Sequence, residues 1–414
     1  MSDLIISEAR RCLQCKKPLC REGCPVKTPF NEIVKILLDG DIVTAGEILF
    51  ENNPLSIVCS LVCPHEKQCE GHCVLGKKGN PIKVGMVEHY ISEYYLNFVS
   101  KIPFNKKNTK VAIVGSGPAG ITIAILLAYR GYDITIFEAH DQIGGVMRYG
   151  IPEFRLPKII LDKLKDKLLE IGIKIRPNTL IGPAISVEDL FRDGYQAVFI
   201  GTGVWNPKVM KIKGETLGHV HHAIDYLKSP AVYSLGKKVC IIGAGNVAMD
   251  VARTVLRNGT RDVTIMYRKG PHSIDADPIE VEYAKLDGVK FNYYQLPVEI
   301  LDEGVRYRQT RVTGTDASGK EIVEEEGSEG IFGCDSVIIA IGQNPRRNIV
   351  NNSRGIDVNN HGLLVTDDYG RTTMDGVFAS GDVVTGARTV VEAVRVSKIV
   401  ADAIEDYIIN KAHK

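Results

Sequence analysis

The sequence lacks an excess of charge of either sign, and it lacks any long run of apolar residues. Its 51 lysines and arginines against 50 aspartates and glutamates give a formal net charge of +1, which offers little attraction to a nucleic-acid backbone or an anionic membrane. No run of about 18 apolar residues is present to span a bilayer. The first residues, MSDLIISEARRCLQC, lack the basic and apolar regions of a secretory signal. We expect a cytoplasmic protein with neither nucleic acid nor membrane as a partner.

Cysteine is scarce outside the first part of the chain. Eight of the ten cysteines lie between residues 12 and 73, and only Cys240 and Cys334 lie beyond them, in segments predicted as buried strands. Since disulfides are reduced in the cytosol, such clustering favours metal binding or redox catalysis. The eight form two quartets, Cys12-x2-Cys15-x4-Cys20-x3-Cys24 and Cys59-x3-Cys63-x5-Cys69-x3-Cys73, each with a Cys-Pro step. This pattern is typical of iron-sulfur ligands, and two structural zinc ions are the alternative.

The rest of the chain contains an internal repeat. At 414 residues the chain is long enough for two or three domains. Residues 1 to about 100 show only helical patterns, and the polar segment 100–109 suits a linker with a boundary near 105. Beyond it, segments 110–138 and 238–268 both read strand, glycine turn, helix, strand. The strands expected at 195–207 and 334–345 also match each other, which predicts two homologous α/β domains, the second inserted into the first.

The first glycine turn has the features of a dinucleotide site. The motif Gly115-Ser116-Gly117-Pro118-Ala119-Gly120 follows the apolar strand VAIV and opens a helix. In this context the glycines permit a tight turn, close approach of a pyrophosphate and close helix packing. Glu138 ends the next strand and can accept hydrogen bonds from ribose hydroxyls. Near the C-terminus, Gly381-Asp382 follows another strand and places a carboxylate before a helix expected from residue 388 or 389.

The second glycine turn differs in the residues that follow it. The motif Gly243-Ala244-Gly245-Asn246-Val247-Ala248 is followed by Arg268 and Lys269 at the position that corresponds to Glu138. Cations at this place pair with a 2′-phosphate, so the second site favours NADP over NAD. The alternative is that the two cations only solvate the end of a strand.

Taken together, these motifs resemble a known family. The carriers of the resemblance are RCLQC-x4-C-x3-CP, ENNPLSIVCSLVCPHEKQCEGHC, GGVMRYGIPEFRLPK, both glycine motifs and GDVVTGARTVVEAV. The chain resembles the small subunit of NADPH-dependent glutamate synthase and the electron-input part of dihydropyrimidine dehydrogenase. The resemblance implies an α/β chain in which an N-terminal helical iron-sulfur domain precedes two Rossmann-like domains, with the NAD(P) domain inserted into the FAD domain. It places two iron-sulfur clusters in residues 1–104, FAD on 105–230 and 344–414, and NAD(P)H on 231–343.

The resemblance also implies particular ligands for two 4Fe-4S clusters. One cluster would be held by Cys12, Cys15, Cys20 and Cys73. The other would be held by Cys24, Cys63, Cys69 and, at the place of a Glu or Gln in relatives, Glu88. Spacing alone would choose Cys59 for that last place, so the two assignments remain open.

The cofactor contacts of the family can be transferred to matching positions in the same way. For FAD they are Gly115, Gly117, Pro118, Ala119, Gly120, Glu138, Val146, Arg155, Gly381, Asp382, Thr389 and Val390. For NADPH they are Gly243, Gly245, Asn246, Val247, Ala248, Arg268, Lys269, Ala340, Ile341 and Gly342. Dihydropyrimidine dehydrogenase has a further phosphate-binding arginine where this chain has Asp275, so NADH is a possible donor as well.

These parts predict hydride transfer from NAD(P)H to the flavin and release of single electrons through the clusters. No serine, histidine and aspartate set calls for hydrolysis, and no separate catalytic residue is predicted. Because two nucleotide domains use up the chain after the linker, a separate and larger catalytic subunit would act on the substrate, and the resemblance implies that this subunit contains FMN. The segment HSIDADPIEVEYAKLDGVKF favours the pyrimidine enzyme, whereas Glu88 favours glutamate synthase. The alternatives are a stand-alone flavin reductase with a zinc-bound docking domain and a non-catalytic scaffold.

Overall fold

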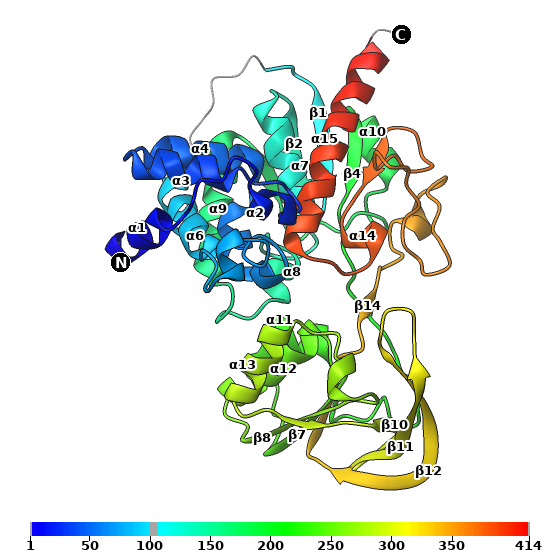
Figure 1. The fold of residues 1–414 in the computed structure, drawn as a ribbon. Helices are drawn as coiled ribbons and strands as arrows, with labels where there is room; N and C mark the ends of the chain where they lie inside the picture. Colours follow the sequence, from blue (N-terminus) through cyan, green and yellow to red (C-terminus); the bar gives the residue numbers. More distant parts are fainter. Residues whose placement is uncertain (1, 99–105, 413–414) are drawn as a thin grey trace. The chain divides into compact units, whose positions relative to one another are not determined.

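The computed structural model describes residues 2–98 and 106–412. Within it the chain divides into two compact units (Figure 1). Unit 1 comprises residues 1–148, 153–204 and 345–414, and unit 2 comprises 149–152 and 205–344. Most of the expected linker at 100–109, with its boundary near 105, lies outside the described residues. The domain limits given above stay predictions.

The N-terminal part of unit 1 is helical. Its helices are Ser2–Arg10 (α1), Leu19–Gly23 (α2), Phe30–Leu38 (α3), Ile42–Asn52 (α4), Ser56–Val62 (α5) and Val84–Tyr95 (α6), with short 3-10 turns at His65–Lys67 (η1) and Val74–Lys77 (η2). Ile33 and Leu37 of α3 are fully or almost fully buried in the core that these helices share. Burying one apolar stripe of each helix is what stabilises such a bundle.

The start of α3 differs from the sequence-based expectation. Thr28 followed by Pro29 predicts a threonine cap with proline in the first turn, but the helix begins at Phe30 and Pro29 is its N-cap residue. The Thr28 hydroxyl is used elsewhere, because it lies 3.5 Å from the Cys24 sulfur and accepts a hydrogen bond from Asn52 Nδ2. A side chain held by these two neighbours is unavailable to the helix.

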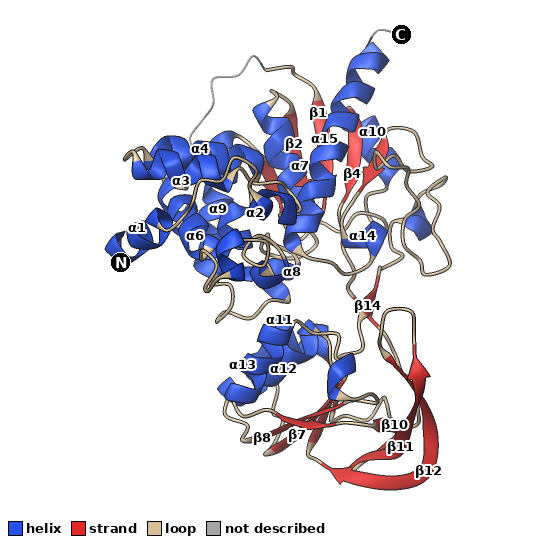
Figure 2. Ribbon diagram, viewed as in Figure 1, coloured by secondary structure: helices blue, strands red, loops and turns tan. Residues whose placement is uncertain are grey.

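The rest of unit 1 is built on a parallel sheet of five strands. Its strands, in the order β15-β4-β1-β2-β3, are Val377–Ala379, Tyr195–Ile200, Lys110–Val114, Asp133–Phe137 and Lys174–Arg176. Its helices are Pro118–Tyr129 (α7), Val146–Tyr149 (α8), Lys158–Ile171 (α9), Val187–Arg192 (α10), Asp382–Thr385 (α14) and Val390–Ala412 (α15), with a 3-10 turn at Val350–Asn352 (η5). Strands such as VAIV are apolar throughout because helices cover both faces of a parallel sheet, and α15 packs on α7 (Figure 2).

Unit 2 repeats this plan and adds a second sheet. Its parallel strands, in the order β6-β13-β7-β8-β9, are Val220–His222, Ser336–Ile339, Lys238–Ile242, Asp262–Met266 and Lys290–Asn292. Its helices are Ala223–Lys228 (α11), Asn246–Arg257 (α12) and Pro278–Leu286 (α13), with 3-10 turns at Pro230–Val232 (η3) and Pro271–Ser273 (η4). The added antiparallel sheet consists of Gln295–Leu301 (β10), Gly304–Thr315 (β11) and Glu321–Gly333 (β12). Two short strands, Asn206–Pro207 (β5) and Gln343–Asn344 (β14), pair where the chain enters and leaves the unit.

The predicted repeat and fold class are confirmed. The elements β1, α7 and β2 correspond to β7, α12 and β8, and β4 corresponds to β13. Unit 2 is inserted, because β15 joins the first sheet only after the chain has returned from it. Cys240 and Cys334 are buried thiols within the core of unit 2, as expected. No helix in residues 2–98 or 106–412 is both long and apolar enough to cross a membrane.

Candidate functional site

The first glycine turn connects β1 to α7 in a geometry that only glycine fits. Gly115 has φ +98°, and a Cβ there would lie 2.6 Å from the Gly201 carbonyl oxygen. A Cβ on Gly120 would lie 2.0 Å from the carbonyl oxygen of Gly115. Helix α7 begins at Pro118, and its N-cap residue, Gly117, provides no side chain to accept a hydrogen bond from the first turn. The first backbone N–H groups of the helix are therefore directed at a site suited to a pyrophosphate.

Glu138 lies just beyond β2 and is held beside this turn. One carboxylate oxygen accepts hydrogen bonds from the backbone N–H and the hydroxyl of Ser116, and the other accepts them from His140, both backbone N–H and Nδ1. Burial acts to raise the pKa of Glu138, but the hydrogen bonds from His140 and Ser116 outweigh it and leave the pKa below its ordinary value. The carboxylate is thus ionised and fixed, as an acceptor for ribose hydroxyls needs to be.

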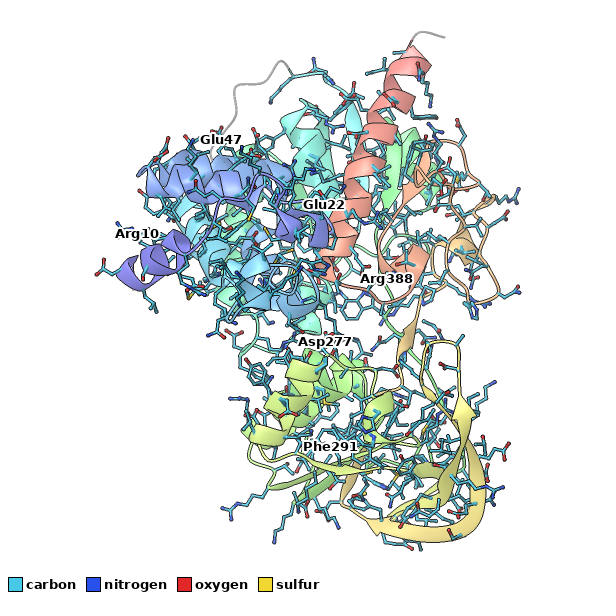
Figure 3. All side chains as sticks on the ribbon, in the orientation of Figure 1. Arg10, Glu22, Glu47, Asp277, Phe291 and Arg388 are labelled. Carbon is cyan, nitrogen blue, oxygen red and sulfur yellow. The ribbon has the colours of Figure 1, made fainter. Side chains whose placement is uncertain are left out.

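The C-terminal segment approaches the same turn. Gly381 has φ +75°, and a Cβ there would lie 3.1 Å from the Cβ of Ala119. Asp382 begins α14, and one of its carboxylate oxygens accepts the backbone N–H of Arg388, a residue labelled in Figure 3. Burial raises the pKa of Asp382 to about 6. The predicted residues of the glycine turn and of the C-terminal segment are therefore brought together, as the family pattern requires.

The remaining predicted FAD positions lie around these residues. Thr389 caps α15, since its hydroxyl accepts the backbone N–H of Glu392 and its own backbone N–H donates to the Glu392 carboxylate, and Val390 is the first residue of that helix. Val146 opens α8, and Arg155 lies in the loop that leads to α9. The expected start of the last helix at residue 388 or 389 is thus one or two residues early, because residues 388 and 389 form its cap.

The second glycine turn, in unit 2, has the same local geometry as the first. Gly243 has φ +118°, and a Cβ there would lie 2.5 Å from the carbonyl oxygen of Ala340. Gly245 is the N-cap residue of α12 without a side-chain cap. Asn246 Nδ2 donates to the carboxylate of Asp277, which Figure 3 labels, and Asn246 Oδ1 accepts the backbone N–H of Asp277. Val247 and Ala248 follow in α12, while Ile341 and Gly342 follow Ala340 after β13.

Arg268 and Lys269 follow β8 and lie in a loop that the added sheet supports. The Arg268 carbonyl accepts the Thr310 hydroxyl at 2.6 Å, and the Lys269 carbonyl accepts the Tyr294 N–H. Gly270 donates its N–H to the Glu321 carboxylate at 2.6 Å. These supporting residues were not predicted. The signal that could have found them is the polar turn DASGK at 316–320 between two long strand-like segments.

Asp275, which departs from the family pattern, has a partner of its own. Its carboxylate forms an ion pair with Lys320, at the start of β12. The pair is exposed to solvent. Burial raises the pKa of Tyr267, the residue before Arg268, and the charge of Asp275 still adds to that effect. Asp275 therefore remains a departure from the family pattern beside Arg268 and Lys269.

Four cysteines from both ends of the helical part line one cavity. They are Cys12, Cys15, Cys20 and Cys73, and all four are partly exposed. Burial raises the pKa of Cys20 to about 11, with smaller contributions from the neighbouring thiol groups of Cys12, Cys73 and Cys15. Phe30, Ile82 and Val84 complete an apolar lining. Four thiols in one apolar-lined cavity fit the ligand set of an iron-sulfur cluster.

The other cysteines surround Glu88, deeper in the bundle. Glu88 projects from α6 and is only 8% exposed, and burial raises its pKa to about 8. Burial also raises the pKa values of Cys24 and Cys69, and the negative charge of Glu88 adds to both effects. Cys63 lies beside Glu88 and in hydrogen-bond contact with Cys59. The structure therefore brings both candidates for the last ligand, Glu88 and Cys59, next to Cys63.

Among the residues that the structure describes, no three histidine, cysteine or acidic side chains converge at the distances of one bound metal ion. The two cysteine groups are thus defined by shared surroundings and mutual electrostatic effects.

Known families match both parts of this arrangement. The pyridine nucleotide-disulphide oxidoreductase family matches residues 109–397, and a family described as dihydropyrimidine dehydrogenase domain II, 4Fe-4S cluster, matches residues 1–98. The chain belongs to the pyridine nucleotide-disulphide oxidoreductase family. Residues 1–98 give this oxidoreductase an iron-sulfur domain of the 4Fe-4S type.

Individual relatives extend over nearly the whole oxidoreductase. The NADPH-dependent glutamate synthase small chain of Halomonas elongata is 33% identical over 97% of this chain and 90% of its own. The homologue of the NAD-dependent dihydropyrimidine dehydrogenase subunit PreT of Salmonella typhi is 33% identical over 98% and 94%. In fold, the oxidoreductase is similar to Mycobacterium tuberculosis FprA in complex with NADPH, with a TM-score of 0.63, 18% identity, and coverage of 74% and 86%.

These findings confirm several predictions. The family resemblance, the NAD(P)H-dependent oxidoreductase activity, the FAD and nicotinamide cofactors and the 4Fe-4S domain are all borne out. The chain is a flavoprotein that transfers electrons from NAD(P)H and carries an iron-sulfur domain. An iron-sulfur domain also replaces the alternative of a zinc-bound docking domain.

Proposed function

We propose that this oxidoreductase is the electron-input subunit of a larger enzyme, which takes hydride from NADPH and delivers single electrons through two 4Fe-4S clusters to a separate catalytic subunit. The observation that carries the proposal is that one compact unit contains both the first glycine turn, where FAD is expected, and the two groups of cysteines. Relatives named as a small chain and as a subunit support the larger partner. FMN in that partner belongs to the same proposal.

The proposed cluster ligands come from these two groups of side chains, and the family resemblance favours Glu88 over Cys59 for the last place. One cluster is held by Cys12, Cys15, Cys20 and Cys73, and the other by Cys24, Cys63, Cys69 and Glu88. Burial raises the pKa values of Cys20 and Cys69, so these thiols are protonated until iron binds. Cluster assembly would therefore release protons, and the charge of iron would compensate for burying the thiolates.

The residues of unit 1 prepare the flavin site. When bound, FAD accepts a hydride and gives up its electrons one at a time. The N–H groups at the start of α7 would receive its pyrophosphate, and the ionised Glu138 would accept hydrogen bonds from its ribose. Asp382, next to Gly381, would accept hydrogen bonds from hydroxyls of the flavin.

The packing of α15 supports an order of electron flow through the two groups of cysteines. Helix α15 starts beside the flavin turn and packs on α5, which contains Cys59 and ends next to Cys63. The group around Glu88 is therefore the nearer electron acceptor. The group around Cys20, whose cavity is also lined by the exposed Leu13 and Leu19, is the one from which electrons leave.

The first test is an anaerobic visible spectrum of the purified chain, with assays of iron, sulfide and zinc on the same sample. Spectra are taken before and after NADPH and, separately, NADH. The proposal requires about eight irons per chain and broad absorbance near 400 nm above the flavin bands, bleached by the nicotinamide donor. A flavin spectrum with zinc and without iron, in protein never exposed to air, would contradict it and leave a stand-alone flavin reductase.

A further inference from the structure

Positive charge is concentrated in two short segments of the helical part. Residues 9–21 and 71–83 contain no aspartate or glutamate, whereas the chain as a whole has a net charge of only +1. Their eight cations are Arg10, Arg11, Lys16, Lys17, Arg21, Lys77, Lys78 and Lys83. These two segments therefore carry a local excess of positive charge, although the chain as a whole is almost neutral. Such an excess creates an electric field that attracts acidic molecules.

The two segments are joined in space around the cavity of the first cysteine group. The Arg11 guanidinium donates to the Asn80 carbonyl at 2.6 Å, and the Lys83 N–H donates to the Glu8 carboxylate at 2.8 Å. The cavity is lined by residues 12, 13, 15 and 18–20 of one segment, which flank Lys16 and Lys17, and by Cys73 to Leu75 of the other. The basic residues therefore border the cavity of Cys12, Cys15, Cys20 and Cys73, where one of the two clusters is proposed.

The centre of this border is apolar and exposed. Leu13 is 61% exposed and Leu19 is 42% exposed, and both line the cavity. Carboxylates are engaged at the margin, where Glu8, Glu32 and Glu70 form ion pairs with Arg11, Arg21 and Lys83.

The remaining cations lie outside these margin contacts. Lys16, Lys17, Lys77 and Lys78 are exposed, and so is Arg10, which Figure 3 labels at the end of α1. We name Arg10, Leu13, Lys16, Lys17, Leu19, Lys77 and Lys78 the basic rim. Its leucines exclude water from a contact, and its cations select the charge of the partner.

We propose that the basic rim is the surface on which an electron-accepting protein docks through an acidic face that has its own redox centre close beneath it. This inference rests on the proposed function, because it requires electrons to leave from the group of Cys12, Cys15, Cys20 and Cys73. Each NAD(P)H supplies two electrons and is oxidised to NAD(P)⁺, so two one-electron acceptors are reduced for every hydride transferred and one proton is released. The complementary charges raise the rate of encounter and orient the two redox centres.

The test compares three acceptors of different charge under NADPH. The acidic haem domain of cytochrome b5, the basic cytochrome c and the neutral quinone menadione are each reduced by the holoenzyme and by Lys16→Glu/Lys17→Glu. The double substitution is expected to lower the second-order rate constant for cytochrome b5 by about 10-fold or more, to leave or raise that for cytochrome c, and to change menadione reduction less than about 2-fold. Salt should lower the wild-type rate with cytochrome b5 and lower it far less for the variant.

The matched control is Lys174→Glu/Lys411→Glu, which makes the same change of charge at exposed lysines of β3 and α15. Equal rates for the rim variant and this control with cytochrome b5 would overturn the docking surface. If the wild-type holoenzyme fails to reduce menadione, or if NADPH does not bleach the cluster absorbance, the proposed function would be overturned instead. A salt-sensitive dimer in sedimentation would assign the rim to a second copy of the chain and contradict the proposal. RNA binding by the wild type that is lost in the rim variant would assign the rim to nucleic acid and contradict it as well.

Discussion

Lys398, in α15, donates a hydrogen bond from Nζ to the backbone carbonyl of Asn52, at the end of α4, over 2.9 Å. Asn52 Nδ2 in turn donates to Thr28 Oγ1, which lies 3.5 Å from the sulfur of Cys24. The ammonium group is half-buried. Burial lowers the pKa of Lys398, and Asp402 and Cys24 partly offset that effect. A cation on α15 is thus held near the sulfur of Cys24. Cys24 is a proposed ligand of the cluster beside Glu88, which we call the inner cluster.

Replacing Lys398 should therefore change the potential of that cluster. Lys398→Met removes a positive charge that stabilises the reduced, more negative cluster, so its midpoint potential should fall by tens of millivolts, on the order of the electrostatic tuning seen in such centres. The measurement is a potentiometric titration followed by electron paramagnetic resonance. Lys398→Arg should restore the potential, and Lys411→Met at the end of the same helix should leave it unchanged. An unchanged potential in Lys398→Met would show that the charge is screened.

The last ligand of the inner cluster can be decided by two single substitutions. Glu88→Ala should halve the iron and sulfide content from about eight irons to about four, because three thiolates alone hold a 4Fe-4S cluster poorly. Cys59→Ser should keep the full content. The outcome is measured by iron and sulfide assays and by the resonance signals of the reduced protein. Loss of iron in Cys59→Ser together with retention in Glu88→Ala would exchange the two roles.

The buried carboxyl of Asp382 should make the flavin-free protein less stable as the pH rises. Since burial raises its pKa in the folded state to about 6 from an ordinary 3.8, the stabilising contribution is complete below about pH 4 and is lost as the pH rises through 6. A shift of about two pKa units corresponds to about 3 kcal/mol.

Asp382→Asn removes this ionisation. The flavin-free variant should withstand more urea than wild type at pH 7 and the same urea at pH 4, while its affinity for FAD falls. Equal urea midpoints at both pH values would contradict the prediction. The control is Asp375→Asn, at an aspartate on the other side of β15 along the chain whose carboxylate accepts the Tyr407 hydroxyl.

The nucleotide preference should depend on the two cations after β8. Arg268→Ala/Lys269→Ala removes charged hydrogen bonds to a 2′-phosphate, each worth about 1.5–3 kcal/mol, so kcat/KM for NADPH should fall by about 10-fold or more. The value for NADH should stay within about 2-fold. Lys285→Ala, an exposed lysine of α13, is the control. Equal losses with both nucleotides would show that the loop acts on the fold and not on the phosphate.

The sequence predicts best those residues whose identity is required by the local backbone geometry. Gly115 and Gly120 could be assigned from the motif because any Cβ there would collide with the backbone, whatever the rest of the fold does. Glu138 follows at a distance along the chain that one helix and one strand determine.

What spacing did not predict is the partnership of distant segments. Spacing grouped the cysteines in chain order, whereas the structure places Cys73 in the cavity of Cys12 because the chain doubles back through α3 to α5; only the family resemblance anticipated this. The support of Gly270 by Glu321 and the contact of Lys398 with Asn52 join residues far apart in sequence, and no local pattern specifies them.

The insertion of unit 2 also dictates an order of assembly during synthesis. Strand β15, at the edge of the first sheet beside β4, consists of residues 377–379, so the ribosome must make all of unit 2 before that sheet can be completed. Residues 205–344 form a nearly continuous stretch with a sheet and core of their own. The nicotinamide unit can thus form while the flavin sheet still waits for its last strand and for α15. A nascent chain stalled anywhere before residue 377 would lack a finished flavin site.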